Sequence, residues 1–260
     1  MNLRDKVALI TGAGSGLGEA TAHELASHGA KIAIVDLPSS GGEKVAQKLS
    51  PNALFASADV ASPEKMESAI AAVVGRFGTV HVLVNCAGIG RAQRTIGKEG
   101  PASLEVFNKV IQVNLVGTFN ATRLAAVQMA KNEPNADGER GVIINTASVS
   151  AYRGATFIEQ AAHGAAKGGV LAITRHLAAS GARHGIRANS ISPGLIVTPQ
   201  ISDFLDEPGH PVHEMARTHP LGRLGQPEDV ARVALFLASA DAAYLNAIDI
   251  VIDGGQSVIS

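Results

Sequence analysis

The sequence has a single cysteine, no tryptophan and few aromatic residues. Cys86 alone cannot form an internal disulfide or a multi-thiolate metal site, which favours a reducing compartment. Aromatic residues make up 3% of the chain, too few for a platform that stacks single-stranded bases. A formal net charge of −1 provides no field that attracts phosphate backbones or anionic lipid. We therefore expect no nucleic-acid partner.

Long hydrophobic runs are also missing. The first apolar run, Val7–Ile10, follows a charged hexapeptide directly, and this pattern differs from that of a signal peptide. No apolar stretch approaches the roughly 20 residues that span a bilayer. We expect a cytoplasmic protein with no membrane segment.

Short apolar runs alternate with longer segments of helical period. With 260 residues, 46% hydrophobic and 17% charged, the chain suits one large α/β core. The runs are nearly continuous in apolar residues, as in a parallel sheet covered on both faces. We predict a doubly wound, Rossmann-like α/β fold with a seven-stranded parallel sheet and helices on both faces, forming a single domain over residues 1–260. The expected strands are Val7–Ile10, Lys31–Val35, Ala53–Ala58, Val82–Val84, Val142–Asn145, Arg187–Ile191 and Ile248–Ile252.

Two further segments have clear signals. Ser62 supplies an N-cap before Pro63 and Glu64, which predicts a helix that ends near Gly78. Residues 199–220 are rich in Pro, Gly and His, which predicts a long loop that serves as a lid over the substrate.

A glycine-rich stretch, Thr11–Gly18, joins the first strand to a helical pattern. Glycines let the backbone approach a pyrophosphate, and the helix N-terminus offers free N–H groups to it. Asp36 ends the second strand, 18 residues beyond Gly18, where a carboxylate accepts hydrogen bonds from a ribose diol and repels a 2′-phosphate. These features predict NAD, in preference to NADP, as the cofactor.

Further motifs resemble the short-chain dehydrogenase/reductase family over nearly the whole chain. They are Thr11-Gly12 with Gly16 and Gly18, Asp59-Val60, Asn85-Cys86-Ala87-Gly88, Asn114, Ser148, Lys167 and Pro193-Gly194. Three longer segments are similar to the type-10 17β-hydroxysteroid dehydrogenases, also called short-chain 3-hydroxyacyl-CoA dehydrogenases. They are residues 36–43, 132–134 and 141–149.

The resemblance implies an NAD-dependent oxidoreductase that interconverts a secondary alcohol and a ketone, with a 3-hydroxyacyl-CoA or a hydroxysteroid as substrate. It also implies a homo-oligomer, a tetramer or a dimer, and the apolar faces of residues 104–131 and 160–184 are candidates for its interface. The implied cofactor-binding residues are Gly12, Ser15, Gly16, Leu17, Asp36, Asp59, Val60, Asn85, Ala87, Gly88, Lys167, Pro193, Gly194 and Thr198.

One catalytic position departs from the family. The resemblance implies that Ser148 holds the substrate oxygen, that Lys167 lowers the pKa of a tyrosine and binds ribose, and that Asn114 holds a relay water. The tyrosine should stand four residues before Lys167, where this sequence has His163. An imidazole can exchange the proton of an alcohol, so His163 is the expected acid and base.

Several alternatives remain open around His163. Because 15 positions separate Ser148 from His163, about two more than usual, with the extra residues in 155–159, Ser150 competes for the role of the substrate serine. Glu159 either orients the His163 ring or faces solvent. In a further alternative, Tyr152 supplies the missing phenol. A chain that binds NAD with little or no turnover is the alternative to an enzyme, because an imidazole is shorter than a phenol.

Two further features of the sequence are a group of histidines near Pro211 and an alanine close to the C-terminus. His210, His213 and Glu214 form no metal site, because Pro211 argues against a regular helical face and favours a solvated loop. Ala247 stands where the family usually has glycine, which puts the local turn in doubt.

Overall fold

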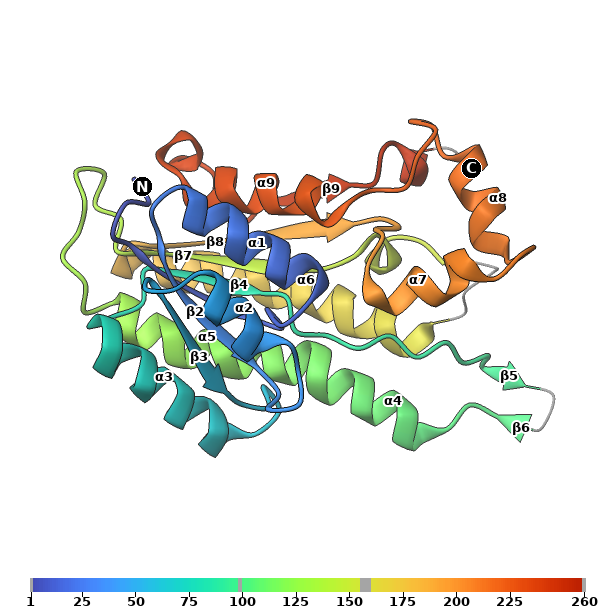
Figure 1. The fold of residues 1–260 in the computed structure, drawn as a ribbon, viewed down its shortest axis with the longest axis horizontal. Helices are drawn as coiled ribbons and strands as arrows, with labels where there is room; N and C mark the ends of the chain where they lie inside the picture. The colour runs from blue at the N-terminus through green and yellow to red at the C-terminus, as the bar shows by residue number, and fades with distance from the viewer. Residues whose placement is uncertain (1, 98–99, 155–159, 259–260) are drawn as a thin grey trace.

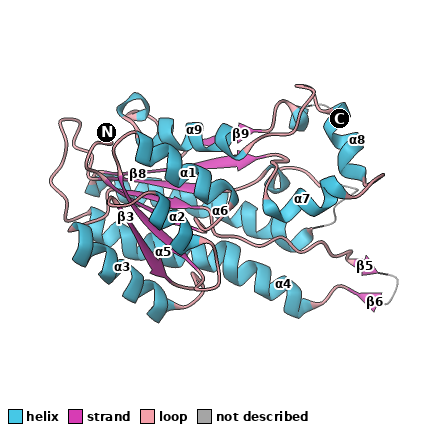
Figure 2. Cartoon of the chain, in the orientation of Figure 1, coloured by secondary structure: helices cyan, strands magenta, loops and turns pink. Residues whose placement is uncertain are grey.

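The computed structural model describes residues 2–97, 100–154 and 160–258. Its centre is a parallel sheet of seven strands in the order β3-β2-β1-β4-β7-β8-β9 (Figures 1 and 2). All seven strands predicted from the apolar runs are confirmed, with ends that shift by one or two residues. They are β1 (Val7–Thr11), β2 (Lys31–Asp36), β3 (Ala53–Ser57), β4 (Val82–Asn85), β7 (Gly141–Thr146), β8 (Ile186–Pro193) and β9 (Asp249–Ile252).

Helices cover both faces of this sheet and form two separate cores. On one face, Ile10 and Ile34 pack with Leu25 of α1 (Gly16–Ser27), with α2 (Gly42–Lys48) and with Leu237 of α9 (Pro227–Ala238). On the other face, Leu9 packs with α3 (Pro63–Phe77), α5 (Gly117–Met129) and α6 (Ala161–Gly181). Neighbouring strand residues point to opposite faces, so one apolar run supplies both cores.

The predicted helix after Ser62 is confirmed as α3. The Ser62 hydroxyl accepts a hydrogen bond from the Lys65 amide, Pro63 occupies the first turn, and Gly78 ends the helix at φ +91°. Residues 104–131, one of the two candidate interface segments, contain two α-helices, because a π-helical turn at Gln112–Val116 separates α4 (Leu104–Ile111) from α5.

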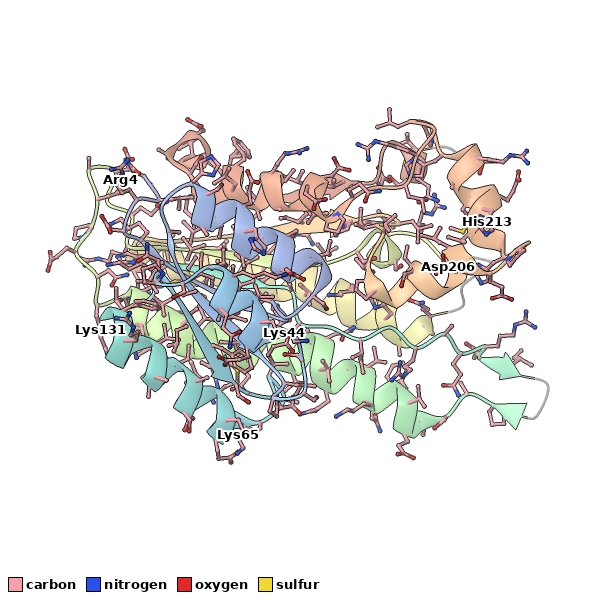
Figure 3. The ribbon with its side chains drawn as sticks, in the orientation of Figure 1. Arg4, Lys44, Lys65, Lys131, Asp206 and His213 are labelled. Carbon is pink, nitrogen blue, oxygen red and sulfur yellow. The ribbon has the colours of Figure 1, made fainter. Side chains whose placement is uncertain are left out.

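The expected loop 199–220 contains two short helices, α7 (Pro199–Asp206) and α8 (Pro211–Thr218). The interpretation of Pro211 as evidence against a helix is therefore wrong. Proline lacks only an N–H that the first turn of a helix leaves unpaired, so Pro211 begins α8. Asp206 and His213 project outward from α7 and α8 (Figure 3).

A two-stranded hairpin, β5 (Ile96–Gly97) with β6 (Gly100–Pro101), was not predicted. It lies with α7 and α8 at the end of the molecule toward which the strands β8 and β9 point (Figure 1). Among the described residues, no helix has both the length and the apolarity to cross a membrane.

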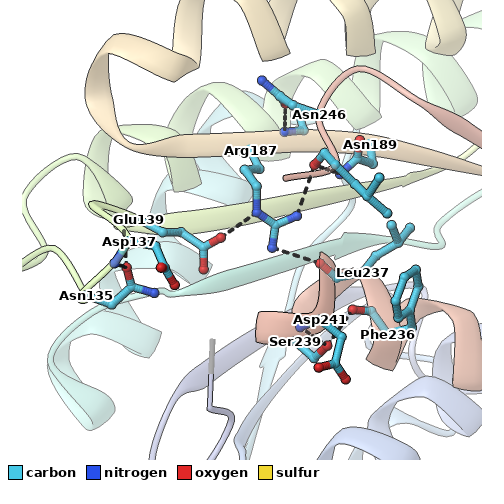
Figure 4. Close-up of polar contacts among 12 residues, drawn as sticks. Asn135, Asp137, Glu139, Arg187, Asn189, Phe236, Leu237, Ser239, Asp241 and Asn246 are labelled. Atoms are coloured by element: carbon cyan, nitrogen blue, oxygen red, sulfur yellow. Dashed lines mark hydrogen bonds and ion pairs between the residues drawn. The ribbon is translucent and has the colours of Figure 1, made fainter. Parts of the chain in front are cut away.

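A buried charge pair anchors the opposite end of β8 (Figure 4). The Arg187 guanidinium pairs with Glu139 and donates to the carbonyl oxygens of Leu237, at 3.0 Å, and Leu245, at 3.3 Å. The side chains of Arg187 and Glu139 are both less than 10% exposed. One cation therefore links the loop before β7 with β8 and with the end of α9.

The doubt about Ala247 has a structural basis, because its φ is +65°. This left-handed conformation costs an L-residue with a side chain roughly 1–2 kcal/mol. Ala247 is exposed, and its amide donates to the Ala188 carbonyl at 2.9 Å, which holds the turn in place.

We expect Ala247→Gly to stabilise the fold by about 1 kcal/mol, because glycine adopts positive φ without steric cost. For a chain of this size, the melting temperature should rise by about 2–4 °C in thermal denaturation. Ala172→Gly, on the exposed side of α6, is the matched control and should destabilise by about 1 kcal/mol. Equal effects of the two substitutions would contradict the assignment of strain to residue 247.

Candidate active site

A cavity of about 500 Å³ opens at the carboxyl ends of the strands. Such a place is expected in an open α/β sheet, because the strand order reverses between β1 and β4 and leaves a crevice there. The cavity brings together nearly all of the predicted site residues: Gly12, Ser15, Gly16, Leu17, Asp36, Asp59, Val60, Ala87, Gly88, Ser148, His163, Lys167, Pro193, Gly194 and Thr198.

The glycine-rich loop lies where backbone approaches backbone. A Cβ on Gly12 would lie 2.6 Å from the Ala87 Cα, and Gly12 itself has φ +67°. At Gly18, a Cβ would collide with the Gly12 carbonyl. Ser15 is the N-cap of α1, and among the described side chains none caps this helix. The first amides of α1 are therefore available to an anionic group in the cavity.

Asp36 is held by two backbone amides. Its Oδ2 accepts a hydrogen bond from the Gly14 amide and its Oδ1 accepts one from the Leu37 amide, both at 2.7 Å. A carboxylate has about four acceptor sites, so each oxygen keeps a further lone pair for a ligand. The contact also explains why residue 14 is a glycine, since a Cβ on Gly14 would lie 2.8 Å from Asp36 Oδ2.

Asn85 does not line the cavity. Its amide donates to Asn145 Oδ1 at 2.9 Å and to Thr122 Oγ1 at 3.1 Å, and the side chain is buried. It thus joins β4 to β7 and α5. The prediction that Asn85 lines the ribose side is wrong for its side chain, and the adjoining Ala87 and Gly88 are the residues on the cavity.

Lys167 and His163 lie on the same face of α6, one helical turn apart. The buried Lys167 ammonium donates to the Thr146 carbonyl at 2.6 Å. Burial lowers the pKa of Lys167 to about 8, because charge is disfavoured away from water. Burial, and secondarily the Lys167 charge, lowers the pKa of His163 to about 4, although a hydrogen bond with the Ile89 backbone opposes this. His163 is therefore neutral at pH 7.

Asn114 contacts the His163 ring from the π-helical turn between α4 and α5. Its Oδ1 accepts from the Ile89 amide at 2.8 Å and its Nδ2 donates to the Ile89 carbonyl at 2.9 Å. The same Nδ2 lies 3.4 Å from His163 Nδ1. π-Helical turns are frequent at functional sites, where they redirect one side chain. This contact could not be predicted from the spacing of Asn114 and His163 in the sequence.

Ser148 and Ser150 both line the cavity, so the structure leaves both as candidates for the substrate serine. The Ser148 hydroxyl accepts a hydrogen bond from the Ser150 amide at 3.1 Å and can still donate its proton. Tyr152 is occupied elsewhere: its hydroxyl donates to Asp249 at 2.7 Å, and burial and this contact raise its pKa to about 12. That position argues against Tyr152 as the missing phenol. Glu159 and the other residues 155–159 lie outside the described part of the chain.

Residues 199–220, which the sequence predicts to be a lid, contribute Pro199, Ile201 and Met215 to the cavity wall. Sequence reasoning missed Arg153 and Gln256, because no motif marks them. Among the described residues, no group of three His, Cys, Asp or Glu side chains could hold a metal ion. The ring of His213, on α8, contacts the carbonyl of Glu207, which directly follows α7, at 2.9 Å.

Known proteins resemble this chain over nearly its whole length. The family model described as Enoyl-(Acyl carrier protein) reductase matches residues 12–257. The human 3-hydroxyacyl-CoA dehydrogenase type-2 is 44% identical over 256 residues, which cover 97% of this chain and 95% of the relative. The chain belongs to the short-chain dehydrogenase/reductase family. It is therefore an oxidoreductase, and nothing in these comparisons favours a chain without turnover.

Two other members of the family have different substrates in their names. Levodione reductase from Leifsonia aquatica is 38% identical over 266 residues, covering 97% of this chain and 94% of the relative. The crystal structure of a 3-ketoacyl-(acyl-carrier-protein) reductase from Brucella melitensis complexed with NADH has a TM-score of 0.87 and 35% identity, covering 98% of this chain and 99% of the other.

The close approach at Gly12 leads to a first test of the site. We expect Gly12→Ala to destabilise the protein by about 2–4 kcal/mol, through positive φ and overpacking against Ala87, and to abolish any rise in melting temperature on addition of a nicotinamide dinucleotide such as NAD. Thermal denaturation with and without NAD measures both effects. Gly75→Ala is the control, because a Cβ there meets no described atom within 4 Å, and it should stabilise α3 by about 0.5–1 kcal/mol.

Proposed function

We propose that this chain is an NAD-dependent dehydrogenase that interconverts secondary alcohols and ketones with His163 as the acid and base. The observation that carries the proposal is the cluster of His163, Lys167 and Asn114 at one end of a cavity whose other end is lined by the glycine-rich loop and Asp36. Of the substrates that the relatives' names suggest, we propose a 3-hydroxyacyl thioester.

The residues present fit a dinucleotide. The missing side chains at Gly12 and Gly18 let the protein backbone approach the dinucleotide. The uncapped amides of α1 suit its pyrophosphate, and Asp36 suits a ribose diol. When bound, the nicotinamide would accept or donate the hydride. The buried Lys167 ammonium would bind the nicotinamide ribose, and Thr198, Pro193 and Gly194 would line that end.

His163 can hold the proton on either ring nitrogen. Asn114 Nδ2 can donate to an unprotonated Nδ1, and the Ile89 backbone also hydrogen-bonds the ring. With the proton on Nδ1, Nε2 is bare and accepts the proton of an alcohol during oxidation. The imidazolium that forms in this way can return the proton from Nε2 to the oxygen of a ketone during reduction, which leaves the ring neutral again. Ser148 or Ser150 would hold that oxygen by a hydroxyl hydrogen bond.

The low pKa of His163 predicts the pH dependence. In alcohol oxidation the neutral ring is the base, so kcat/KM should rise through about pH 4 and then level off. Above about pH 8, Lys167 loses the charge that holds the ribose, so the rate should fall. The initial rate of NADH formation between pH 3.5 and 10 measures both limbs.

His163→Gln should lower kcat by about 10²–10⁴-fold and remove the acid limb, because the amide cannot take a proton. His163→Tyr restores a proton-exchanging group and should exceed the Gln variant in activity. The proposal fails if His163→Gln retains both the rate and the acid limb of the parent.

The choice of NAD over NADP depends on the Asp36 charge. We expect Asp36→Asn to lower the ratio of kcat/KM for NAD to that for NADP by roughly tenfold or more, because the carboxylate no longer repels a 2′-phosphate. Glu43→Gln, an exposed carboxylate on α2, is the control and should leave the ratio unchanged. An unchanged ratio in Asp36→Asn would assign the preference to another residue.

We also propose that the chain works as a homo-oligomer. Val116, Phe119 and Val127 are 40–55% exposed along one stretch of α5 and its preceding turn, where a second copy would cover them. A dimer or tetramer and a cytoplasmic location remain predictions. So does the role of residues 199–220 as a lid over a single domain.

A further inference from the structure

The charges on the cavity are divided between its two halves. The carboxylate of Asp36 ends β2 and that of Asp59 follows β3, whereas the cations Lys109, Arg153 and Lys167 come from segments after β4. The strand order places β2 and β3 on one side of β1 and β7 to β9 on the other. Among the described residues that line the cavity, no carboxylate comes from the second half. The half that holds His163 is therefore positive.

Two cations of this half are exposed, Lys109 on α4 and Arg153 in the turn after β7. Arg153 lines the cavity with Ser150, Gln160 and Gln256. Lys167, in contrast, is buried and bound to the Thr146 carbonyl. The mechanism proposed above uses His163, Lys167 and Asn114 and assigns no task to Arg153.

The local structure holds Arg153 in place before any ligand arrives. Its amide donates to the Val149 carbonyl at 3.2 Å, which closes the turn after Ser148. The neighbouring Tyr152 hydroxyl donates to Asp249 on β9 at 2.7 Å. The Arg153 Nη1 donates to the Gln256 carbonyl at 2.6 Å. The side chain is thus fixed at both ends, which reduces the entropy that a ligand must remove.

Most of the guanidinium remains available for a ligand. An arginine has five N–H donors in a planar fork that matches carboxylate and phosphate oxygens. Only the Nη1 bond to the Gln256 carbonyl uses this fork within the described part of the chain. Neutral substrates gain little from such a group, whereas an anion gains a charge-assisted hydrogen bond.

We propose that Arg153 binds an anionic group of the substrate, remote from the reacting carbon, and that the chain therefore prefers anionic hydroxyacyl substrates to neutral alcohols. This inference rests on the proposed function and adds the chemistry that selects the substrate. The anion is either the carboxylate of a free hydroxy acid or a phosphate of a thioester carrier such as CoA. A cyclic alcohol or a hydroxysteroid without a charge lacks this contact.

The test compares three substrates that share one reacting group: 3-hydroxybutyrate, 3-hydroxybutyryl-CoA and the uncharged N-acetylcysteamine thioester of 3-hydroxybutyrate. For the parent and for Arg153→Gln, kcat/KM is measured with each. We expect the ratio of an anionic to the neutral substrate to fall about tenfold in Arg153→Gln, mainly through KM. The parent's preference should also weaken as salt is raised, because exposed charges are screened.

Two other variants serve as controls. Arg183→Gln removes an exposed arginine that lies away from the cavity and should leave the ratios unchanged. Lys109→Gln removes a cation on the same cavity but on α4. If the ratio falls in Lys109→Gln and not in Arg153→Gln, the assignment to Arg153 is wrong.

The outcomes separate the sources of the anion. A fall with 3-hydroxybutyrate alone supports a carboxylate, and a fall with the CoA thioester alone supports a carrier phosphate. An equal fall with all three substrates would show that Arg153 only braces the turn, and it would overturn the inference.

A binding measurement separates this inference from the proposed function. Calorimetry measures the affinity of acetoacetate, acetoacetyl-CoA and the acetoacetyl N-acetylcysteamine thioester for the NAD-saturated protein. If the parent turns over none of the substrates, the proposed function fails. The inference then still predicts about tenfold weaker binding of an anionic ligand to Arg153→Gln, and equal binding to both proteins overturns it.

Discussion

The close approach of β1 and β4 is the constraint on which the site depends. The strand order reverses at this point, so the connections after the two strands lead to opposite faces and leave a crevice between them. The backbone of Gly12 lies against that of Ala87 so closely that no side chain fits at residue 12. Any widening of this contact would displace both the amino end of α1 and the segment of Gly88. The position of α1 relative to β4 therefore determines where a dinucleotide can lie.

The chemistry at the other end follows from burial. Lys167 is placed under the site, bound to the Thr146 carbonyl, and burial lowers its pKa as well as that of His163. A phenol beside such a lysine would be activated by a lower pKa. An imidazole is affected differently, since the same cation and the same burial keep it neutral. A histidine at this position is thus a weak base that stays unprotonated at neutral pH, and Asn114 and the Ile89 backbone contact its ring.

Much of the fold could be predicted because its signals are local. All seven strands are short runs rich in apolar residues, and α3 has its own N-cap at Ser62 and ends at Gly78. The hairpin β5–β6 has two residues in each strand, too few for any pattern to appear. Pro211 gives no sequence signal for α8 when proline is interpreted as a helix breaker, although proline suits the first turn of a helix.

The candidate site was less predictable where contacts join distant segments. Asp36 and Lys167 could be assigned from strand ends and helix spacing. Asn85 could not, since its neighbours Thr122 and Asn145 are 37 and 60 positions away, and only the sheet reveals that its amide is used between strands. Arg153 is another case, because its partner Gln256 lies 103 positions away. A motif identifies the residue types, and the tertiary fold decides which of them reach the cavity.

The division of charge across the cavity connects these features. The order of the strands separates the carboxylates at the ends of β2 and β3 from the cations that come after β4. The acidic half suits the hydroxyl groups of a ribose, which donate hydrogen bonds, and the basic half suits an acyl substrate with a negative group. Lys167 is buried, whereas Arg153 and Lys109 are exposed, so the cations of the basic half lie at different depths. Lys167 lowers the proton affinity of His163, and Arg153, with most of its N–H donors unused, is the group that we propose selects the substrate by its charge.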